Sequence, residues 1–512
     1  MKNRIFFIKF ILLISILSIP FIFLLSIISN SSINPLFPVV DKKSLDLSSS
    51  NWSNASVISD IYGWNNGSSY NPKIVTDKNG NLHVVWHDET AGEWGTDTEI
   101  MYANYTAAGW SNATVISDIY GWNDGLSFNP SIATDKVGNL HVVWYDSTNG
   151  EWGTDLEIMY VNYTTNGWSN ATVISDVYGW NNGASYYPRI ATDNNGNIHV
   201  VWYDDTNGEW GTDTEIMYVN YTGAIWSNAT VISDVYGWNN DSSMLPTIAT
   251  DNGGNIHVVW RDETNGEWGM DEEIMYANYT VAGWSNATVI SDDYTGWNND
   301  YSYQPEITID NNGNLHVVWY DNTDGEWGTD EEIMYVNYTA SGWSNASVIS
   351  DVYGWNNNYS LNPSIVSDSN GNIHIMWQDR TAGEWGTDYE IMYTNNTGMG
   401  WSNATCISDL YGWNNDDSWY PSIATDDNGN IHVVWQDYTA GEWGIDIEIM
   451  YTNKTSNFPN IISVLRDPLT PGNLDTVNIT VHVTDDVEVD TVLLNSNHTA
   501  IQEDHLMNFL SG

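Results

Sequence analysis

The chain has 512 residues and carries 66 Asp and Glu against 13 Lys and Arg, a formal net charge of −53. This balance excludes nucleic acid as a partner, because a phosphate backbone is bound by Lys and Arg that replace its counterions. It also disfavours docking on anionic lipid. The one cysteine, Cys406, excludes an intrachain disulfide, and we expect it to be a small core residue because Val stands at the same place in other repeats.

Residues 1–30 begin with Lys2 and Arg4 and continue as an apolar run. This is the pattern of an export signal, either cleaved or retained as a membrane anchor, and residues 31–50 follow as a linker. Positive charge ahead of the apolar run predicts a secreted or cell-surface protein that touches a membrane only through such an anchor. Repeated Asn-x-Ser/Thr sequons, for example at Asn54, Asn104 and Asn112, fit a glycosylated exterior.

Seven near-identical repeats fill residues 51–455. Each contains four short runs rich in β-branched and aromatic residues, which in the first repeat are 72–77, 81–88, 99–105 and 110–117. Four antiparallel strands repeated seven times predict an all-β fold, a seven-bladed β-propeller. The repeats are marked by WSNATVIS or a close variant, spaced by 58 residues and once by 59, at Trp52, Trp110, Trp168, Trp226, Trp284, Trp343 and Trp401.

The two ends of the repeat array predict how the ring closes. The array begins with the WSNASVIS segment at Trp52, which has no other strands before it, and it ends at Glu448–Asn453 with no such segment after it. We therefore expect the N-terminal strand to complete the last blade, whereas an open solenoid would need capping repeats.

The segment Ser69–Trp86 reads S-x-x-P-x-I-x-x-D-x-x-G-N-x-H-V-V-W, and the pattern returns in every later repeat. It resembles the sialidase-like (BNR-type) propellers, in particular those of large prokaryotic surface proteins. The resemblance implies the fold and an exported location. Catalysis of the sialidase kind would need an arginine cluster and a Tyr nucleophile assisted by an acid. The ring has only Arg189, Arg261 and Arg380, at three different repeat positions, so we expect no convergence on the axis and predict no catalytic residue.

The tail at 456–512 lacks the tryptophan signature of the repeats. Its VNITVHVTD segment alternates as a half-buried strand does. This predicts the start of an immunoglobulin-like β-sandwich, left incomplete because such a domain takes about 100 residues.

The longer loops, Glu89–Asp97 and Asp60–Ser69 in the first repeat, are predicted to lie on one face of the ring, which is where binding residues concentrate. Their tryptophans either stack on sugar rings or fasten each loop to its neighbour. A residue pair before each repeat's proline differs between repeats and leads into the innermost strand, so it is expected to line the mouth of the central channel. The predicted ligand-binding residues are Trp64, Tyr70, Trp94, Trp122, Phe128, Trp152, Tyr186, Tyr187, Tyr303, Trp419 and Tyr420.

Acidic side chains on the same face raise the question of a metal. Asp88, Glu93 and Asp97 present carboxylates without basic partners, a donor set that suits Ca²⁺; the alternative is that they are solvated or accept backbone hydrogen bonds. Asp77 and His83 have counterparts in all seven repeats, so we interpret them as structural, Asp77 as the brace of an Asx turn.

Three functions remain open at this level. The favoured hypothesis is non-enzymatic recognition or adhesion outside the cell, with a glycan or a surface protein as the ligand and Ca²⁺ as the one cofactor considered. The second is a structural component of a surface layer or stalk. The third is a sialidase-like glycoside hydrolase.

Overall fold

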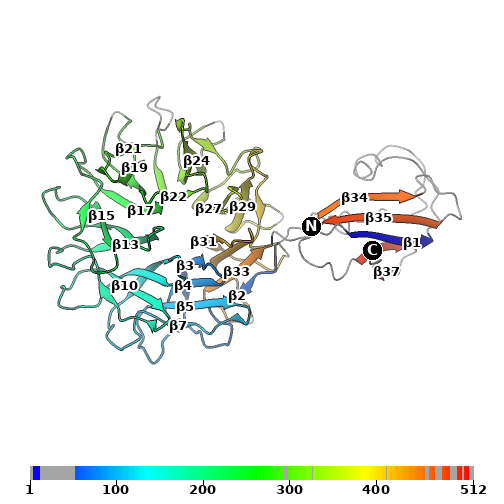
Figure 1. Ribbon diagram of the computed structural model, residues 1–512, viewed down its shortest axis with the longest axis horizontal. Coiled ribbons are helices and arrows are strands. Elements are labelled where there is room, and N and C mark those ends of the chain that lie inside the picture. Colours follow the sequence, from blue (N-terminus) through cyan, green and yellow to red (C-terminus); the bar gives the residue numbers. More distant parts are fainter. Residues whose placement is uncertain are drawn as a thin grey trace. The chain divides into compact units, whose positions relative to one another are not determined.

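The computed structural model describes 52–455, apart from 293–297 and six single residues, and also 4–11, 460–467, 476–484, 493–498 and 501–506. The six single residues are Glu267, Asn299, Glu326, Glu384, Tyr411 and Glu442. Two compact units result, one spanning Trp52–Lys454 and one joining Met1–Asn51 with Thr455–Gly512. The first unit is a ring of seven blades around a central axis, as predicted (Figure 1).

Each blade is an antiparallel sheet whose strands follow the chain from the axis outward. The innermost strands are β3 (Ser69–Thr76), β8 (Ser127–Thr134), β13 (Ser185–Thr192), β17 (Ser243–Thr250), β22 (Ser302–Ile309), β27 (Ser360–Ser367) and β31 (Ser418–Thr425). The second strands are β4 (Leu82–Asp88), β9 (Leu140–Asp146), β14 (Ile198–Asp204), β18 (Ile256–Asp262), β23 (Leu315–Asp321), β28 (Ile373–Asp379) and β32 (Ile431–Asp437). The third strands are β5 (Glu99–Thr106), β10 (Glu157–Thr164), β15 (Glu215–Tyr221), β19 (Glu273–Thr280), β24 (Glu332–Thr339), β29 (Glu390–Asn396) and β33 (Glu448–Lys454).

The outermost strand is shorter than predicted. In four blades the expected run divides into two pieces that both pair with the third strand: β6 (Gly109–Trp110) and β7 (Thr114–Val115), β11 (Gly167–Trp168) and β12 (Thr172–Val173), β20 (Gly283–Trp284) and β21 (Thr288–Val289), β25 (Gly342–Trp343) and β26 (Ser347–Val348). The other blades keep only β16 (Thr230–Val231), β30 (Thr405–Cys406) and β2 (Ser56–Val57) as named strands. The break arises because the Ser111 side chain replaces a ladder contact: its Oγ accepts from the Asn104 N–H at 3.0 Å.

The core lies between neighbouring blades. Strand β4 is buried along its whole length, and its Trp86 is 0% exposed. It packs in one cluster with Val434, Ile449 and Tyr451 of the blade that precedes it around the ring. Each face of a blade therefore buries its apolar side chains against the next blade, which is what makes a two-sided apolar strand such as LHVVW stable here.

The ring closes as predicted. Strand β2 pairs with β33, with Ser56 opposite Tyr451 and Val57 opposite Met450. Trp52 and Ile58, which flank β2, are buried. The N-terminal segment thus supplies the outer strand of the last blade.

Hydroxyl groups also link the inner strands around the axis. Thr76 Oγ donates to the Thr425 carbonyl of the neighbouring blade at 2.7 Å, and five equivalent bonds follow around the ring. The seventh position cannot donate such a hydrogen bond, because Ile309, which has no hydroxyl group, stands where the other blades have Thr or Ser.

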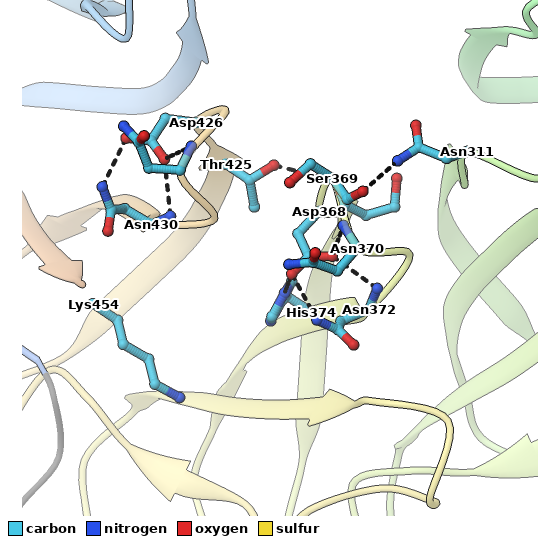
Figure 2. Close-up of polar contacts among 12 residues, drawn as sticks. Asn311, Asp368, Ser369, Asn370, Asn372, His374, Thr425, Asp426, Asn430 and Lys454 are labelled. Carbon is cyan, nitrogen blue, oxygen red and sulfur yellow. Dashed lines mark hydrogen bonds and ion pairs between the residues drawn. The ribbon is translucent and has the colours of Figure 1, made fainter. Parts of the chain in front are cut away.

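The hairpin turns confirm the structural interpretation of Asp77 and His83. Figure 2 shows the equivalent turn of β27–β28, where Asp368 accepts from the backbone N–H groups of Asn370 and Asn372, each at 2.8 Å. The Asn372 amide donates to the second carboxylate oxygen at 2.7 Å. His374 bonds the Tyr393 hydroxyl through Nδ1 at 2.9 Å. These side chains brace the turn, as predicted for an Asx turn.

The second unit contains two small antiparallel sheets. One orders β1 (Arg4–Ile11), β35 (Thr476–Thr484) and β34 (Asn460–Asp467), and the other pairs β36 (Leu493–His498) with β37 (Ile501–Leu506). Strand β35 matches the alternating segment of the tail. The remainder of the predicted signal and the linker at 31–50 lie outside the described residues. No helix among the described residues is long and apolar enough to cross a bilayer.

Candidate binding site at the axial mouth

A cavity of about 110 Å³ lies where the first strands of all seven blades begin. It is lined by one residue from the variable pair of every blade, most of the prolines that follow them, and Lys73, Arg189 and Glu306. The seven variable residues that line it are Asn71, Asn129, Tyr187, Leu245, Gln304, Asn362 and Tyr420.

The backbone at these seven positions explains why only one residue of each pair faces the cavity. All seven have positive φ, between 47° and 53°, although none is glycine. The next residue is always a proline, which keeps its neighbour out of the α region and supplies no N–H to the ladder, so the strand bulges here. A non-glycine residue in this conformation costs about 1–3 kcal/mol, and such strain concentrates at functional sites.

The bulge corrects part of the predicted site. Tyr187 and Tyr420 line the cavity, as expected. The first residues of the pairs do not; they lie beside it and pack on the second strand or on neighbouring loop residues. These residues are Tyr70, Phe128, Tyr186, Tyr303 and Trp419.

Over the first three blades these side chains form a continuous aromatic arc. Tyr70 stacks on His87, with ring centroids 5.3 Å apart, and His87 meets Phe128 edge-on at the same centroid distance. The ring centroids of Phe128 and Tyr145 are 5.6 Å apart. The arc continues from Tyr145 to Tyr187 at 5.9 Å and then to Tyr203 at 5.6 Å. Burial lowers the pKa of His87 to about 3, so the imidazole is neutral and acts as one more aromatic ring.

In the sixth and seventh blades Gln378 and Gln436 stand where the arc has His87 and Tyr145. Gln436 Oε1 accepts from the Asn71 N–H at 3.0 Å, and Gln378 Oε1 accepts from the Tyr420 N–H at 3.2 Å. The mouth therefore departs from sevenfold symmetry at this position of the second strand.

The wall of the cavity carries excess positive charge. Glu306 lies between Arg189 at 3.4 Å and Lys73 at 3.9 Å. Burial and the neighbouring Arg189 lower the pKa of Lys73 to about 8, so at neutral pH it still carries most of its charge. Two cations and one anion face the axis of a chain whose net charge is −53. Sequence reasoning missed this group, although its three members are the charged residues at one repeat position.

The three arginines do not gather in one place. Arg189 lines the axial cavity, whereas Arg261 is held by Glu263 and Glu272, each at 2.6 Å, and lies over the Tyr303 ring at 4.4 Å. Arg380 lies over the Tyr389 ring at 5.5 Å. Arg189 lines the cavity, while Arg261 and Arg380 are not among its lining residues, so the three arginines do not converge on the axis, as expected.

The loop tryptophans fasten the loops. Trp94 Nε1 donates to the Thr90 carbonyl at 3.0 Å, and its ring lies edge-on to Trp64 at 6.4 Å. A side-chain carbon at Gly92 would come within 2.4 Å of the Trp94 ring, so glycine permits this packing. Trp152 makes the equivalent bond to Thr148, and Trp122 packs against the core. None of the four lines the axial cavity.

The three carboxylates predicted for calcium have separate environments. Asp88 is buried and accepts from Ser69, Trp86 and the Thr90 backbone at 2.7–2.9 Å. Its oxygens are used by the protein, so this residue is corrected from ligand to core brace. Glu93 is exposed, and Asp97 Oδ2 is buried without a hydrogen-bond partner among the described residues. No group of three or more potential metal-ligating side chains occurs within the described part of the chain, and calcium binding stays a prediction.

Replacing Asp88 tests its assignment as a brace. Asp88→Ala should lower the free energy of unfolding by about 3 kcal/mol or more, because it leaves several buried donors without an acceptor. Glu93→Ala should change it by less than about 0.5 kcal/mol. Urea unfolding of both variants measures the difference, and equal midpoints would contradict the assignment.

No protein-family model matches the chain, and no curated protein matches it. Solved structures do resemble it. An ulvan lyase of polysaccharide lyase family 25 superimposes with a TM-score of 0.50 at 13% identity, covering 75% of this chain and 94% of that one. A Dyadobacter fermentans protein of unknown function superimposes with a TM-score of 0.45 at 12% identity, covering 79% of this chain and 98% of that one. The intramolecular trans-sialidase of Ruminococcus gnavus superimposes with a TM-score of 0.41 at 12% identity, covering 78% of this chain and 97% of that one. At these identities the likeness is one of fold.

Proposed function

We propose that the ring is a non-enzymatic, extracytoplasmic recognition protein that binds a carbohydrate at the axial mouth. The aromatic arc from Tyr70 to Tyr203 carries the proposal. Flat aromatic faces beside a cavity suit the apolar faces of sugar rings, and the amides that line the cavity, such as Gln304 and Asn362, suit sugar hydroxyls. The ulvan lyase that shares the fold is described as bound to a sulfated disaccharide, which supports carbohydrate binding by a propeller.

The wall charges supply a preference among carbohydrates. Lys73 and Arg189 exceed Glu306 by one positive charge, so an anionic substituent that enters the cavity would be attracted there. Elsewhere the strongly acidic surface repels an anionic chain. A carbohydrate with a carboxylate or sulfate is therefore expected to bind in one place, the axial mouth.

Catalysis is not part of the proposal. Glu263 and Glu272 are among the acids that depart from the sevenfold pattern, and both are engaged by Arg261 outside the cavity lining. The neighbouring Tyr303 has a raised pKa because it is partly buried, so its hydroxyl stays protonated at neutral pH.

A glycan array probed with the full chain, in calcium and again with a chelator, tests the proposal. Binding of one class of anionic glycan supports it, and dependence on calcium would assign the loop carboxylates a metal role. Absence of binding in both conditions would contradict it and leave the structural role in a surface layer or stalk.

The arc predicts which substitution weakens binding. Tyr187→Ala should weaken the affinity about tenfold or more, equivalent to at least about 1.4 kcal/mol, because Tyr187 belongs to both the arc and the cavity lining. Tyr62→Ala is the matched control, since Tyr62 is exposed and does not line the cavity. Titration calorimetry on the array's best ligand compares the two; equal affinities would place the ligand elsewhere.

A further inference from the structure

Among the Asn-x-Ser/Thr sequons of the ring, fourteen form two structural classes, with one member of each class per blade; Asn51, Asn66, Asn240 and Asn358 begin further sequons outside these classes. The first class has the form Asn-Ala-Ser/Thr and comprises Asn54, Asn112, Asn170, Asn228, Asn286, Asn345 and Asn403. The second lies within the third strands and comprises Asn104, Asn162, Asn220, Asn278, Asn337, Asn395 and Asn453. We call these the rim asparagines and the strand asparagines.

The rim asparagines lie at the break in the outermost strand. Asn112 is in the gap between β6 and β7, where the chain forms no ladder. It is exposed, and so is Thr114, which supplies the sequon hydroxyl. Ala113 between them packs against the core, which turns the two polar side chains outward. Both sequon side chains are exposed in all seven blades.

The strand asparagines are held inside a sheet. Asn104 lies opposite His83 in the ladder, its N–H donates to Ser111 Oγ, and its carbonyl accepts from the Ser111 N–H at 2.8 Å. All seven are only partly exposed. A glycan attached here would have to leave a site where the backbone is paired on both sides.

We propose that the rim asparagines are N-glycosylated and that the strand asparagines are not, which gives each blade one glycan at its rim. The donor is a sugar linked to a lipid phosphate or pyrophosphate. A bond forms between Asn Nδ2 and the sugar C1, the bond from C1 to the phosphate oxygen breaks, the lipid phosphate leaves, and the amide loses one proton. The modification depends on the proposed export, since transfer takes place outside the cytoplasm.

The position gives these glycans a physical role. The outer strands are only two residues long, so part of each third strand's outer edge is left without a full partner strand. Unpaired edges invite pairing with another chain, and bulky or charged groups at the edge prevent it. A hydrophilic chain on Asn112 and its equivalents covers that edge in every blade.

The test uses the full chain secreted by a host that has an oligosaccharyl transferase, with occupancy of each sequon mapped by mass spectrometry. Protein recovered from the medium has already been exported, so the result reports on glycosylation and not on export. High occupancy of the rim asparagines with little at the strand asparagines is the expected result. Unmodified rim asparagines, or equal occupancy of the two classes, would overturn the proposal.

A pair of substitutions within one blade sharpens the test. Thr114→Ala removes the rim sequon of its blade without touching Asn112, and the intact mass should fall by one glycan. Thr106→Ala removes the strand sequon at Asn104 and should leave the number of glycans unchanged. The reverse outcome would assign the modification to the strand class.

Discussion

The ring is expected to lose stability steeply as the pH rises from about 5 to about 9. The cause is a glutamate that opens each third strand and is at most 1% exposed in every blade. Burial raises its pKa from 4.5 to about 8 or 9. The seven residues are Glu99, Glu157, Glu215, Glu273, Glu332, Glu390 and Glu448.

The surroundings of Glu332 show why it holds a proton. Ser350 Oγ and Asn356 Nδ2 donate to one of its oxygens, and the other has no hydrogen-bond partner among the described residues. Asn356 also donates to Asp379 of the next blade, at 3.1 Å, and the same Asp379 oxygen accepts from Trp377 Nε1 at 2.8 Å. Two carboxyl groups thus share one junction. Asp379 has the better set of donors, so Glu332 is the neutral member.

The stability falls with rising pH because the pKa of each glutamate is raised in the folded ring. A pKa raised in the folded state means that the folded ring binds protons that the unfolded chain has already released. The stabilisation is fully present below about pH 4.5 and is lost as the pH rises through the folded value of about 8 or 9. All seven glutamates shift in the same direction, so their contributions to the pH dependence have the same sign.

Thermal unfolding across the pH range measures the slope. Replacing the seven glutamates by Gln keeps the shape and removes the titration, so the variant should lose most of the dependence and be the more stable protein at alkaline pH. Glu93→Gln, on an exposed residue, is the control and should behave like the original. An unchanged slope in the sevenfold variant would show that these carboxyls are ionised in the folded ring.

The fold could be predicted from the sequence because its determinants are local and repeated. Asn79-Gly80 specifies a hairpin, and the apolar second strand specifies burial on both faces. The unmatched segment at Trp52 was enough to predict the closure. These signals act within one repeat, and seven copies of each remove the ambiguity of a single occurrence.

The site was predicted less well because it depends on backbone geometry and on contacts between blades. Simple strand alternation does not reveal the kink at Asn71, which separates the two residues of each variable pair; the proline after it was the available signal. The contact of Arg189 with Glu306 joins residues 117 apart in sequence. The burial of Glu99 was not predicted, although the apolar IMY that follows this glutamate in each repeat indicated a strand interior.

Removing the closing segment is the second change with a large expected effect. Deleting 52–59 from the full chain should lower the free energy of unfolding by several kcal/mol. The segment buries Trp52, which meets Tyr393 edge-on at 5.1 Å, and Ile58, which is 1% exposed. Loss of a buried Trp or Ile side chain costs about 2–5 kcal/mol each. The deletion also takes away the Ser59 hydroxyl that bonds Glu448 and leaves the outer edge of β33 without a strand.

Moving the segment to a position after β33 tests whether the loss of stability comes from the missing outer strand of the last blade. In a second variant the same eight residues follow Lys454, joined by the turn that precedes Trp110 in the first blade, Thr106–Gly109. The strand then pairs with β33 as a hairpin, as in the other blades, and the urea midpoint should return close to the original. Deleting eight residues of the linker at 31–50 is the control. If the 52–59 deletion variant unfolds at the original urea midpoint, the last blade does not need the N-terminal strand. If the relocated strand does not restore the midpoint, the loss of stability does not come from the missing pairing with β33.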